Sequence, residues 1–254
     1  MNYIQSFNRY EKKYLLSSAQ YEKLMQEAEK IITPDSYGKH TICNIYLDTE
    51  DYFFIRNSIE KPVYKEKLRI RSYGIPNSDS KVFLEIKKKF KGVVYKRRIS
   101  ANENDIMDYV LNGIISEEMA EKVNPQILSE IDYIMRSLSP VPKLYLAYDR
   151  QAFTGTENPE LRVTFDSRIR SRTDELLLSA GDSGTLLDVK LLNENRELFT
   201  DESYRLMEIK INGAMPIEMA RLLSELKIYP VSFSKYGEIY KKMITAERSI
   251  SAAI

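Results

Sequence analysis

Lysine and arginine side chains recur at alternate positions in several segments of this sequence. Between Leu161 and Arg170 the alternate positions carry Arg162, Asp166, Arg168 and Arg170, and similar alternation occurs in 67–71, 82–89 and 206–211. Successive side chains of a β-strand point to opposite faces, so each segment would bury an apolar row and present a charged one. Guanidinium and ammonium groups from several strands would suit a chain of phosphates, whose oxygens accept hydrogen bonds and carry negative charge.

A hydrated strand face is the simpler explanation for any one of these segments, because antiparallel sheets often have one wet side. The sign of the charge argues for more than hydration. The chain has 38 Lys and Arg against 37 Asp and Glu, yet these rows hold many more bases than acids. Clustered cations repel one another unless a ligand compensates them, so the pattern predicts a concave site for a polyanion.

The composition excludes several other classes of protein. With 254 residues and 43% hydrophobic content, the chain can form a core, and we expect a single domain because no linker or repeat interrupts it. The one cysteine, Cys43, is expected in the core with Ile45 and Leu47, and the one histidine, His40, in a loop at a strand entry. Zinc sites built from His and Cys are thereby excluded. No signal peptide or membrane-spanning run is evident, so we expect a soluble, cytoplasmic protein.

The remaining pattern predicts an α+β fold in which two blocks of antiparallel strands form a closed or nearly closed barrel with helices packed outside. Four loop residues, 234–237, are expected to interrupt the chain before the last helix, which should begin at Glu238. Strands are predicted at 7–16, 41–48, 64–73, 81–90, 93–100, 143–153, 160–171, 184–192 and 203–213. Helices are predicted at 18–31, within 51–59 and 101–139, after Pro216, and from Glu238 to about Arg248.

The charged rows of these strands contain acids as well as bases. Their members are Arg9, Glu11, Lys13, Lys67, Arg69, Arg71, Glu85, Lys87, Lys89, Lys96, Arg98, Tyr148, Arg150, Arg162, Asp166, Arg168, Asp188, Lys190, Glu208 and Lys210. The carboxylates could hold a hard divalent cation that bridges phosphate oxygens, or form salt bridges with neighbouring bases. Salt bridges are the better explanation for most of them, and Glu208 is the strongest candidate for a metal ligand.

Seven short motifs in the same order resemble the VTC domain, the polyphosphate polymerase branch of the triphosphate tunnel (CYTH-like) superfamily. The resemblance covers about residues 7–242. The motifs are Arg9-Tyr10-Glu11-Lys12-Lys13-Tyr14, Lys67-Leu68-Arg69-Ile70-Arg71-Ser72-Tyr73, Phe83-Leu84-Glu85-Ile86-Lys87, Tyr148-Asp149-Arg150-Gln151-Ala152-Phe153, Leu161-Arg162-Val163-Thr164-Phe165-Asp166, Met207-Glu208-Ile209-Lys210 and Ser234-Lys235-Tyr236.

This resemblance implies an antiparallel tunnel barrel with a basic lumen, which transfers the γ-phosphate of ATP to a polyphosphate chain with Mn²⁺ or Mg²⁺. It implies catalytic roles for Lys13, Arg69, Arg71, Arg150, Arg162 and Lys210. It also implies substrate binding by Lys87, Tyr148 and Lys235 and metal binding by Glu208. The charged rows add Arg9, Lys67, Lys96, Arg98 and Lys190 as expected substrate-binding residues and Glu11 as an expected metal ligand. Related domains can be joined to membrane segments, so a membrane-protein partner is possible.

The first motif separates the polymerase from other members of the superfamily. Hydrolases and cyclases typically open with Glu-x-Glu-x-Lys, whereas this chain has Arg9, Glu11 and Lys13 at that spacing. Replacing one carboxylate by a base disfavours a two-metal hydrolytic site. An inorganic triphosphatase and a noncatalytic polyanion-binding module remain alternatives. Nucleic-acid binding is not expected, because aromatic residues do not interleave with the basic rows as stacking platforms would.

Overall fold

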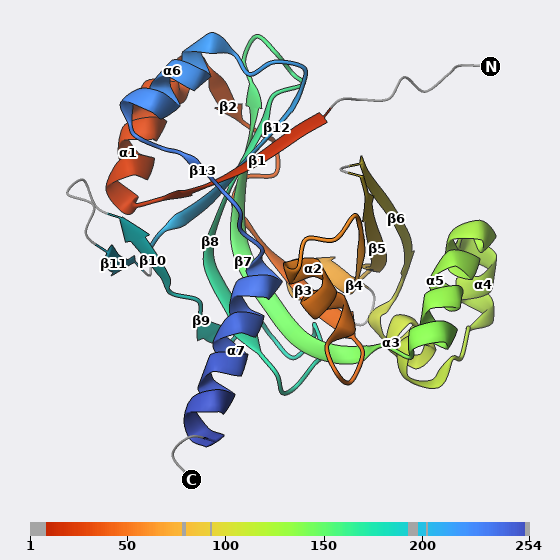
Figure 1. Ribbon diagram of the computed structural model, residues 1–254. Coiled ribbons are helices and arrows are strands. Elements are labelled where there is room, and N and C mark those ends of the chain that lie inside the picture. Colours follow the sequence, from red (N-terminus) through yellow and green to blue (C-terminus); the bar gives the residue numbers. More distant parts are fainter. Residues whose placement is uncertain (1–8, 78–79, 92, 193–197, 202, 252–254) are drawn as a thin grey trace. The chain divides into compact units, whose positions relative to one another are not determined.

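A computed structural model of the chain describes residues 9–77, 80–91, 93–192, 198–201 and 203–251 (Figure 1). The strands are β1 (Arg9–Leu16), β2 (Ile32–Pro34), β3 (His40–Asp48), β4 (Tyr64–Tyr73), β5 (Val82–Phe90), β6 (Val93–Ala101), β7 (Val141–Gly155), β8 (Arg162–Arg172), β9 (Thr185–Leu186), β10 (Val189–Leu192), β11 (Leu198–Asp201), β12 (Arg205–Asn212) and β13 (Pro230–Val231). The helices are α1 (Ser18–Glu27), α2 (Phe53–Ile59), α3 (Glu103–Asn112), α4 (Glu117–Lys122), α5 (Pro125–Leu138), α6 (Ile217–Glu225) and α7 (Lys235–Ser251), with a 3₁₀ turn, η1 (Ala28–Lys30).

The chain forms two compact units, each assembled from three separate stretches of sequence. The first unit comprises residues 1–40, 148–169 and 186–233, and the second comprises 41–147, 170–185 and 234–254. The long strands β7 and β8 each contribute residues to both units. The expectation of a single domain stays a prediction.

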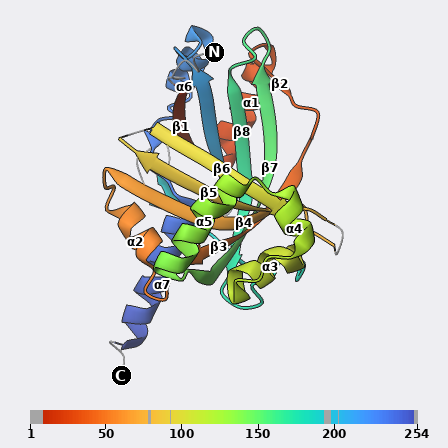
Figure 2. The ribbon, with the colours of Figure 1, turned by 90° about the vertical axis from the view of Figure 1, so that its right-hand side faces the viewer.

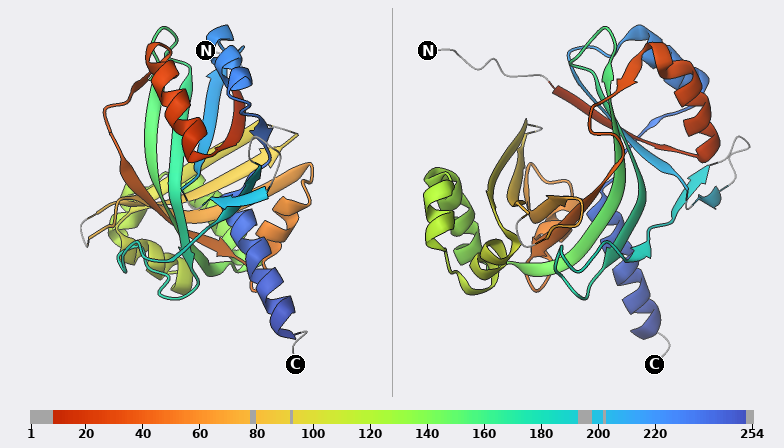
Figure 3. Two further views of the ribbon diagram at one scale, coloured as in Figure 1. Left: turned by 90° about the vertical axis from the view of Figure 1, so that its left-hand side faces the viewer. Right: turned by 180° about the vertical axis from the view of Figure 1, so that it is seen from behind.

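The strands of the first unit follow the hydrogen-bonded order β13-β1-β12-β8-β7, with β2 paired to β7. Helices α1 and α6 lie side by side on one face of these strands (Figure 3). Leu24 of α1 and Met219 of α6 pack there against Phe165, Met207 and Ile209 of the strands, all almost completely buried. Because side chains alternate along each strand, the opposite face carries the polar row.

The strands of the second unit follow the order β7-β3-β4-β5-β6. One face of this sheet is covered by α3, α4 and α5, which lie in front of β4, β5 and β6 in Figure 2. Ile45, Ile70 and Leu84 of the sheet pack against Ile106 of α3 and Ile131 of α5. Cys43 is fully buried in this cluster, as expected for a core cysteine.

Capping residues explain where several helices begin. Ser17 accepts a hydrogen bond from the backbone N–H of Gln20, whose side chain accepts one from the N–H of Ser17, a capping box that starts α1. Asn102 caps α3 by accepting a hydrogen bond from the backbone N–H of Asp105, and Pro125 occupies the first turn of α5, where its missing N–H costs nothing.

The α+β class, the antiparallel pairing and the helices outside the sheet are confirmed. Three local predictions are wrong. Helix α1 ends at Glu27 rather than at 31. The last helix begins at Lys235 rather than Glu238, because the Ser234 side chain accepts a hydrogen bond from the N–H of Gly237. The predicted strand at 184–192 is two short strands, of which β10 pairs with β11 in a separate two-stranded sheet.

The alternation in β8 also ends earlier than the sequence pattern indicates. Arg168 has a φ of 48°, a left-handed conformation that shifts the side chains after it to the other face. Arg170 is therefore buried, and its Nε donates to the backbone carbonyl of Asp182 instead of joining the polar row. In the described part of the chain, no helix has both the length and the apolar composition needed to span a membrane.

Candidate functional site

A basic surface covers the polar face of the second unit. Strand pairing places Tyr46, Arg69, Glu85 and Arg98 in one row across β3, β4, β5 and β6. Lys67, Lys87 and Lys96 form the neighbouring row. We call this face, with Asn44 and Arg71, the basic face. It brings together residues up to 54 positions apart in the sequence only because β3 to β6 are consecutive antiparallel neighbours.

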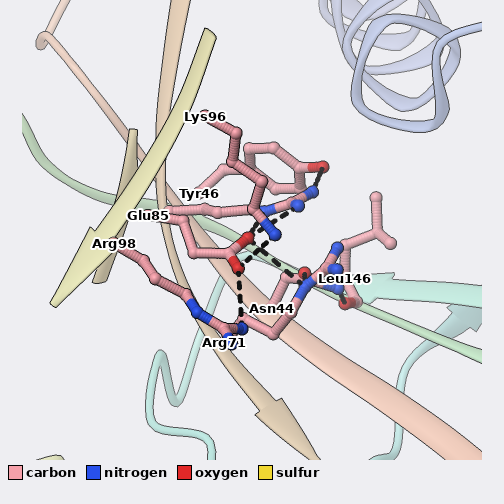
Figure 4. Close-up of polar contacts among 8 residues, drawn as sticks. Asn44, Tyr46, Arg71, Glu85, Lys96, Arg98 and Leu146 are labelled. Carbon is pink, nitrogen blue, oxygen red and sulfur yellow. Dashed lines mark hydrogen bonds and ion pairs between the residues drawn. The ribbon is translucent and has the colours of Figure 1, made fainter. Parts of the chain in front are cut away.

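Glu85 lies at the centre of the basic face and is almost completely buried (Figure 4). Its Oε2 accepts hydrogen bonds from Nε and Nη2 of Arg69 at 3.0 and 2.8 Å. Lys96 Nζ forms an ion pair with Oε1 at 2.6 Å. Arg71 and Arg98 each lie 3.8 Å from the carboxylate. Glu85 therefore holds four bases in place and is occupied as a salt-bridge partner rather than as a metal ligand.

The charges around Glu85 keep it ionised. Burial alone would raise the pKa of its carboxyl, but Arg69, Arg71 and Lys96 together lower that pKa to about 2. One carboxylate neutralises only part of the charge of the bases around it. The remaining positive charge is what an anionic ligand would compensate.

Two polar side chains of β3 orient the arginines of β4. Asn44 Oδ1 accepts a hydrogen bond from Arg71 Nε at 2.9 Å, and its Nδ2 donates to the backbone carbonyl of Leu146 at 2.9 Å (Figure 4). The hydroxyl of Tyr46 accepts a hydrogen bond from Nη1 of Arg69 at 3.3 Å. Each guanidinium is thus held by a second side chain, which fixes the direction in which its remaining N–H groups point.

The turn before α7 belongs to the same unit and reaches the basic face. Lys67 Nζ donates to the hydroxyl of Ser234 at 3.0 Å. Tyr236 donates its hydroxyl proton to Asp48 at 2.9 Å, and Asp48 also accepts from the N–H groups of Phe54 and Ile55 at the start of α2. Asp48 therefore ties the starts of α2 and α7 together beside the basic face.

A second polar surface lies on the first unit and follows β1, β12, β8 and β7. Strand pairing places Lys13 opposite Glu208 and Lys210 opposite Arg162. Arg150 donates from Nε and Nη2 to the two oxygens of the fully buried Asp166 at 2.6 and 2.8 Å. We call this surface, with Tyr148, the mixed face, because carboxylates and bases alternate on it.

The arginines of the mixed face differ in how they are held. Arg150 lies between Asp166 and the ring of Tyr148, whose centroid is 5.2 Å from the guanidinium carbon. Arg162 is exposed and makes no hydrogen bond or ion pair with any residue that the structure describes. Arg150 is therefore a fixed part of the face, whereas Arg162 presents a cation that a ligand can contact.

Glu208 is a strongly perturbed carboxylate of the mixed face. Burial would raise its pKa, but Lys210, a hydrogen bond with Glu11 and the charge of Lys13 together hold that pKa far below its usual range. Lys210 Nζ lies 2.9 Å from Oε1 of Glu208, and Lys13 Nζ also donates to the backbone carbonyl of Phe233 at 3.0 Å. Glu208 is consequently a carboxylate at neutral pH, the form in which it can bind a metal ion.

The carboxylates of the mixed face suit a metal ion that arrives with a phosphate ligand. Within the described residues, no group of three or more His, Cys, Asp or Glu side chains could hold a metal by itself. Glu11 and Glu208 lie on the paired strands β1 and β12 and supply two adjacent carboxyl groups that share a hydrogen bond. Mg²⁺ is commonly held by one or two carboxylates together with water and substrate phosphates. This donor set therefore fits a divalent ion whose other ligands are phosphate oxygens.

The structure brings most of the predicted site residues to these two faces. Lys67, Arg69, Arg71, Lys87, Lys96 and Arg98 are on the basic face, and Lys13, Arg150, Arg162, Lys210, Tyr148, Glu208 and Glu11 on the mixed face. Lys235 begins α7. Two residues differ. Lys190 lies on β10, away from both faces' strands, and the side chain of Arg9 lies outside the described part of the structure.

The sequence analysis missed Asn44, Tyr46 and Asp48. They occupy alternate positions of β3, opposite the buried row of Cys43, Ile45 and Leu47, so the same alternation that indicated the basic rows could have indicated them. They are uncharged or acidic, so they are not part of the rows of basic residues from which the site was predicted.

Comparison with known proteins adds a family and a set of distant structural relatives. The chain matches the model of the VTC domain family over residues 8–244. No curated protein sequence matches it.

Solved structures resemble the chain at low sequence identity. A "putative adenylate cyclase" from Bacillus halodurans is 13% identical, with 88% of this chain and 92% of that chain covered and a TM-score of 0.49. A "putative adenylyl cyclase" from Hippeastrum that reveals a dominant triphosphatase activity is 14% identical, with 91% and 95% covered and a TM-score of 0.49. A protein from Pyrococcus horikoshii is 13% identical, with 92% and 99% covered and a TM-score of 0.41.

Proposed function

Because this chain belongs to the VTC domain family, we propose that it is a polyphosphate polymerase, which transfers the γ-phosphate of ATP to a growing polyphosphate chain. The observation that carries the proposal is the excess of positive charge around Glu85 on the basic face. That charge is held in fixed directions and suits a ligand with several phosphate groups. The cytoplasm supplies ATP and is the proposed location, with a membrane protein as a possible partner.

Phosphoryl transfer requires little covalent chemistry from the protein itself. Transfer of a phosphoryl group needs the attacking and leaving oxygens in line and the developing charge neutralised. Arg69 and Arg71 are held by Glu85, Tyr46 and Asn44, so they can bind phosphate oxygens without further ordering. On the mixed face, Lys13, Lys210 and Arg162 supply cations, and Arg150, fixed by Asp166, supplies a rigid donor group.

A divalent ion, Mn²⁺ or Mg²⁺, would be held by Glu208 and Glu11 and would neutralise charge on the phosphate oxygens during transfer. The ionised state of Glu208 supports this role. Lys210 and Lys13 keep Glu208 deprotonated and would also contact phosphate oxygens bound beside it.

The alternative activity is hydrolysis of tripolyphosphate. The described residues provide two adjacent carboxylates at Glu11 and Glu208, and the residue two positions before Glu11 is Arg9 rather than a third acid. A site with two metal ions needs more carboxylate ligands than this. The donor set therefore favours transfer between phosphates over activation of water.

Product analysis with ATP distinguishes the candidate functions. Purified protein is incubated with ATP and either Mn²⁺ or Mg²⁺, and the products are followed by ³¹P NMR. Growth of the resonance of internal phosphates, strongly reduced in Arg69→Ala and unchanged in the exposed control Arg136→Ala on α5, supports the polymerase. Release of inorganic phosphate from tripolyphosphate without chain growth supports the triphosphatase instead. Tight binding of polyphosphate without consumption of ATP would support a noncatalytic module, and either of these results overturns the proposal.

A further inference from the structure

The hydroxyl of Tyr46 is a buried donor that has no acceptor in the described protein. Tyr46 is 8% exposed, and its oxygen accepts a hydrogen bond from Nη1 of Arg69 at 3.3 Å. A phenol both donates and accepts, and no described residue accepts the proton of this one. Buried polar hydrogens are normally paired, so the geometry points to an acceptor that the chain does not itself provide.

The ring of Tyr46 is held in a fixed orientation. It packs on the ring of Tyr236, with 4.7 Å between centroids, and the hydroxyl of Tyr236 donates to Asp48. The guanidinium carbon of Arg69 lies 6.0 Å from the Tyr46 centroid. Figure 4 shows the Tyr46 ring beside Lys96 and the Glu85 network. The hydroxyl is therefore aimed by packing as well as by its hydrogen bond.

The groups around Tyr46 are mainly cationic. From the elements packed near it they are Lys67, Arg69 and Arg71 on β4, Glu85 on β5, Lys96 on β6, Asp48 on β3, Tyr52 before α2 and Tyr236 on α7. Burial raises the pKa of Tyr46, but Arg69, Lys67 and Arg71 outweigh burial and lower that pKa to about 7. Without a ligand, the phenol is therefore about half ionised near pH 7.

We propose that Tyr46 is a phosphate-binding residue whose protonated hydroxyl donates a hydrogen bond to an oxygen of a phosphate bound by Arg69 and Arg71. The inference rests on the proposed function, which supplies the phosphate ligand. A phosphate oxygen can accept the hydrogen bond that the Tyr46 hydroxyl proton does not make within the described protein. The negative charge of the phosphate then takes the place of the negative charge of a Tyr46 phenolate. A phenolate and a phosphate beside the same guanidinium would repel each other, so the two compete.

This competition makes phosphate binding depend on pH. Loss of the proton from Tyr46 weakens binding, and by linkage a bound phosphate raises the pKa of Tyr46. With a pKa of about 7 in the free protein, the contribution of Tyr46 to affinity falls by about tenfold between pH 6 and pH 8. Tyr46→Phe cannot ionise and lacks this dependence.

Calorimetric titration with tripolyphosphate at pH 6, 7 and 8 tests the inference in the wild type and in Tyr46→Phe. The ligand itself titrates in this range, so the measured quantity is the ratio of the two dissociation constants at each pH, in which that titration cancels. We expect the ratio to change by about tenfold in favour of the wild type at pH 6. Tyr133→Phe, at an exposed position on α5, is the control and keeps the wild-type profile.

A spectroscopic titration gives a second readout. Phenolate absorbance near 295 nm should rise around pH 7 by the amount of one tyrosine in the ligand-free wild type, shift to higher pH with tripolyphosphate, and be absent in Tyr46→Phe. Identical pH profiles of binding in the two proteins, or no tyrosine titrating near pH 7, would overturn this inference alone. Failure of the wild type to bind tripolyphosphate at any pH would overturn the proposed function with it.

Discussion

Glu85 determines how the bases of the basic face are arranged. It is one almost completely buried carboxylate in contact with Arg69, Arg71, Lys96 and Arg98. A buried carboxylate is costly unless it is paired, and removing one partner of such a network leaves the other charges uncompensated. Glu85 therefore contributes to stability and positions the cations, while it cancels only part of their charge.

Glu85→Gln should destabilise the protein in a pH-dependent manner. The folded pKa of about 2 lies below the ordinary glutamate value of 4.5, so the stabilisation is present above pH 4.5 and is lost as the pH falls toward 2. A shift of this size corresponds to about 3 kcal/mol of unfolding free energy. Urea unfolding should show that loss at pH 7 and little difference near pH 2.

Glu130→Gln is the matched control for that substitution. Glu130 of α5 also pairs with two bases, Lys88 of β5 and Arg97 of β6, but its carboxylate is partly exposed. Its loss should cost less than about 1 kcal/mol. Equal effects of the two substitutions at pH 7 would contradict the role given to Glu85.

Arg162 and Arg150 should separate binding from stability. Arg162 is exposed and has no partner among the described residues, so Arg162→Ala should weaken tripolyphosphate binding about tenfold and leave the melting temperature unchanged. Arg150→Ala removes both guanidinium hydrogen bonds of the fully buried Asp166 and should cost about 3 kcal/mol or more of stability. Calorimetry with thermal unfolding measures both quantities. A large loss of stability in Arg162→Ala would show that the guanidinium has a structural partner.

At the scale of elements, the start of α7 links a helix cap to the basic face. Ser234 accepts a hydrogen bond from the N–H of Gly237 and another from Lys67 Nζ. The cap explains why the helix begins at Lys235 despite the glycine at position 237. The contact with Lys67 means that the same hydroxyl positions a cation.

Ser234→Ala should therefore lose both stability and affinity. Removal of a helix cap costs about 1 kcal/mol, and release of Lys67 should weaken tripolyphosphate binding severalfold. Ser116→Ala, which removes the cap of α4 but touches no cation of the basic face, should show the loss of stability alone. Chemical unfolding and calorimetry on both variants check this. Equal affinities in the two variants would contradict the link between cap and site.

At the scale of the whole chain, the sequence predicts secondary-structure elements better than it predicts which strands pair and which side chains are in contact. Alternation located β4, β5 and β6 to within one residue, because each buries one apolar row. The short strands β2, β11 and β13 were missed, since two to four residues carry no measurable period. The left-handed Arg168 was also missed, because a local backbone conformation leaves no trace in hydrophobicity.

The candidate site could be predicted from the sequence to the same extent. The rows of bases in the sequence identified most of the cations of the site, because each of these bases lies on a strand whose apolar and polar residues visibly alternate. Which side chain fixes which base could not be predicted, because Asn44, Tyr46 and Asp166 act through contacts between strands that only the register defines. Lys190 was assigned to the same rows because its strand pattern does not reveal that β10 pairs with β11.

A crystal structure with tripolyphosphate and Mn²⁺ tests the central claim most directly, which is that the fixed cations of the basic face bind linked phosphates. We predict phosphate oxygens within hydrogen-bond distance of Arg69 and Arg71, with the Tyr46 hydroxyl in contact with one of them. An ordered ligand bound elsewhere, with no phosphate oxygen near Arg69 or Arg71 and their contacts with Glu85, Tyr46 and Asn44 unchanged, would contradict the account.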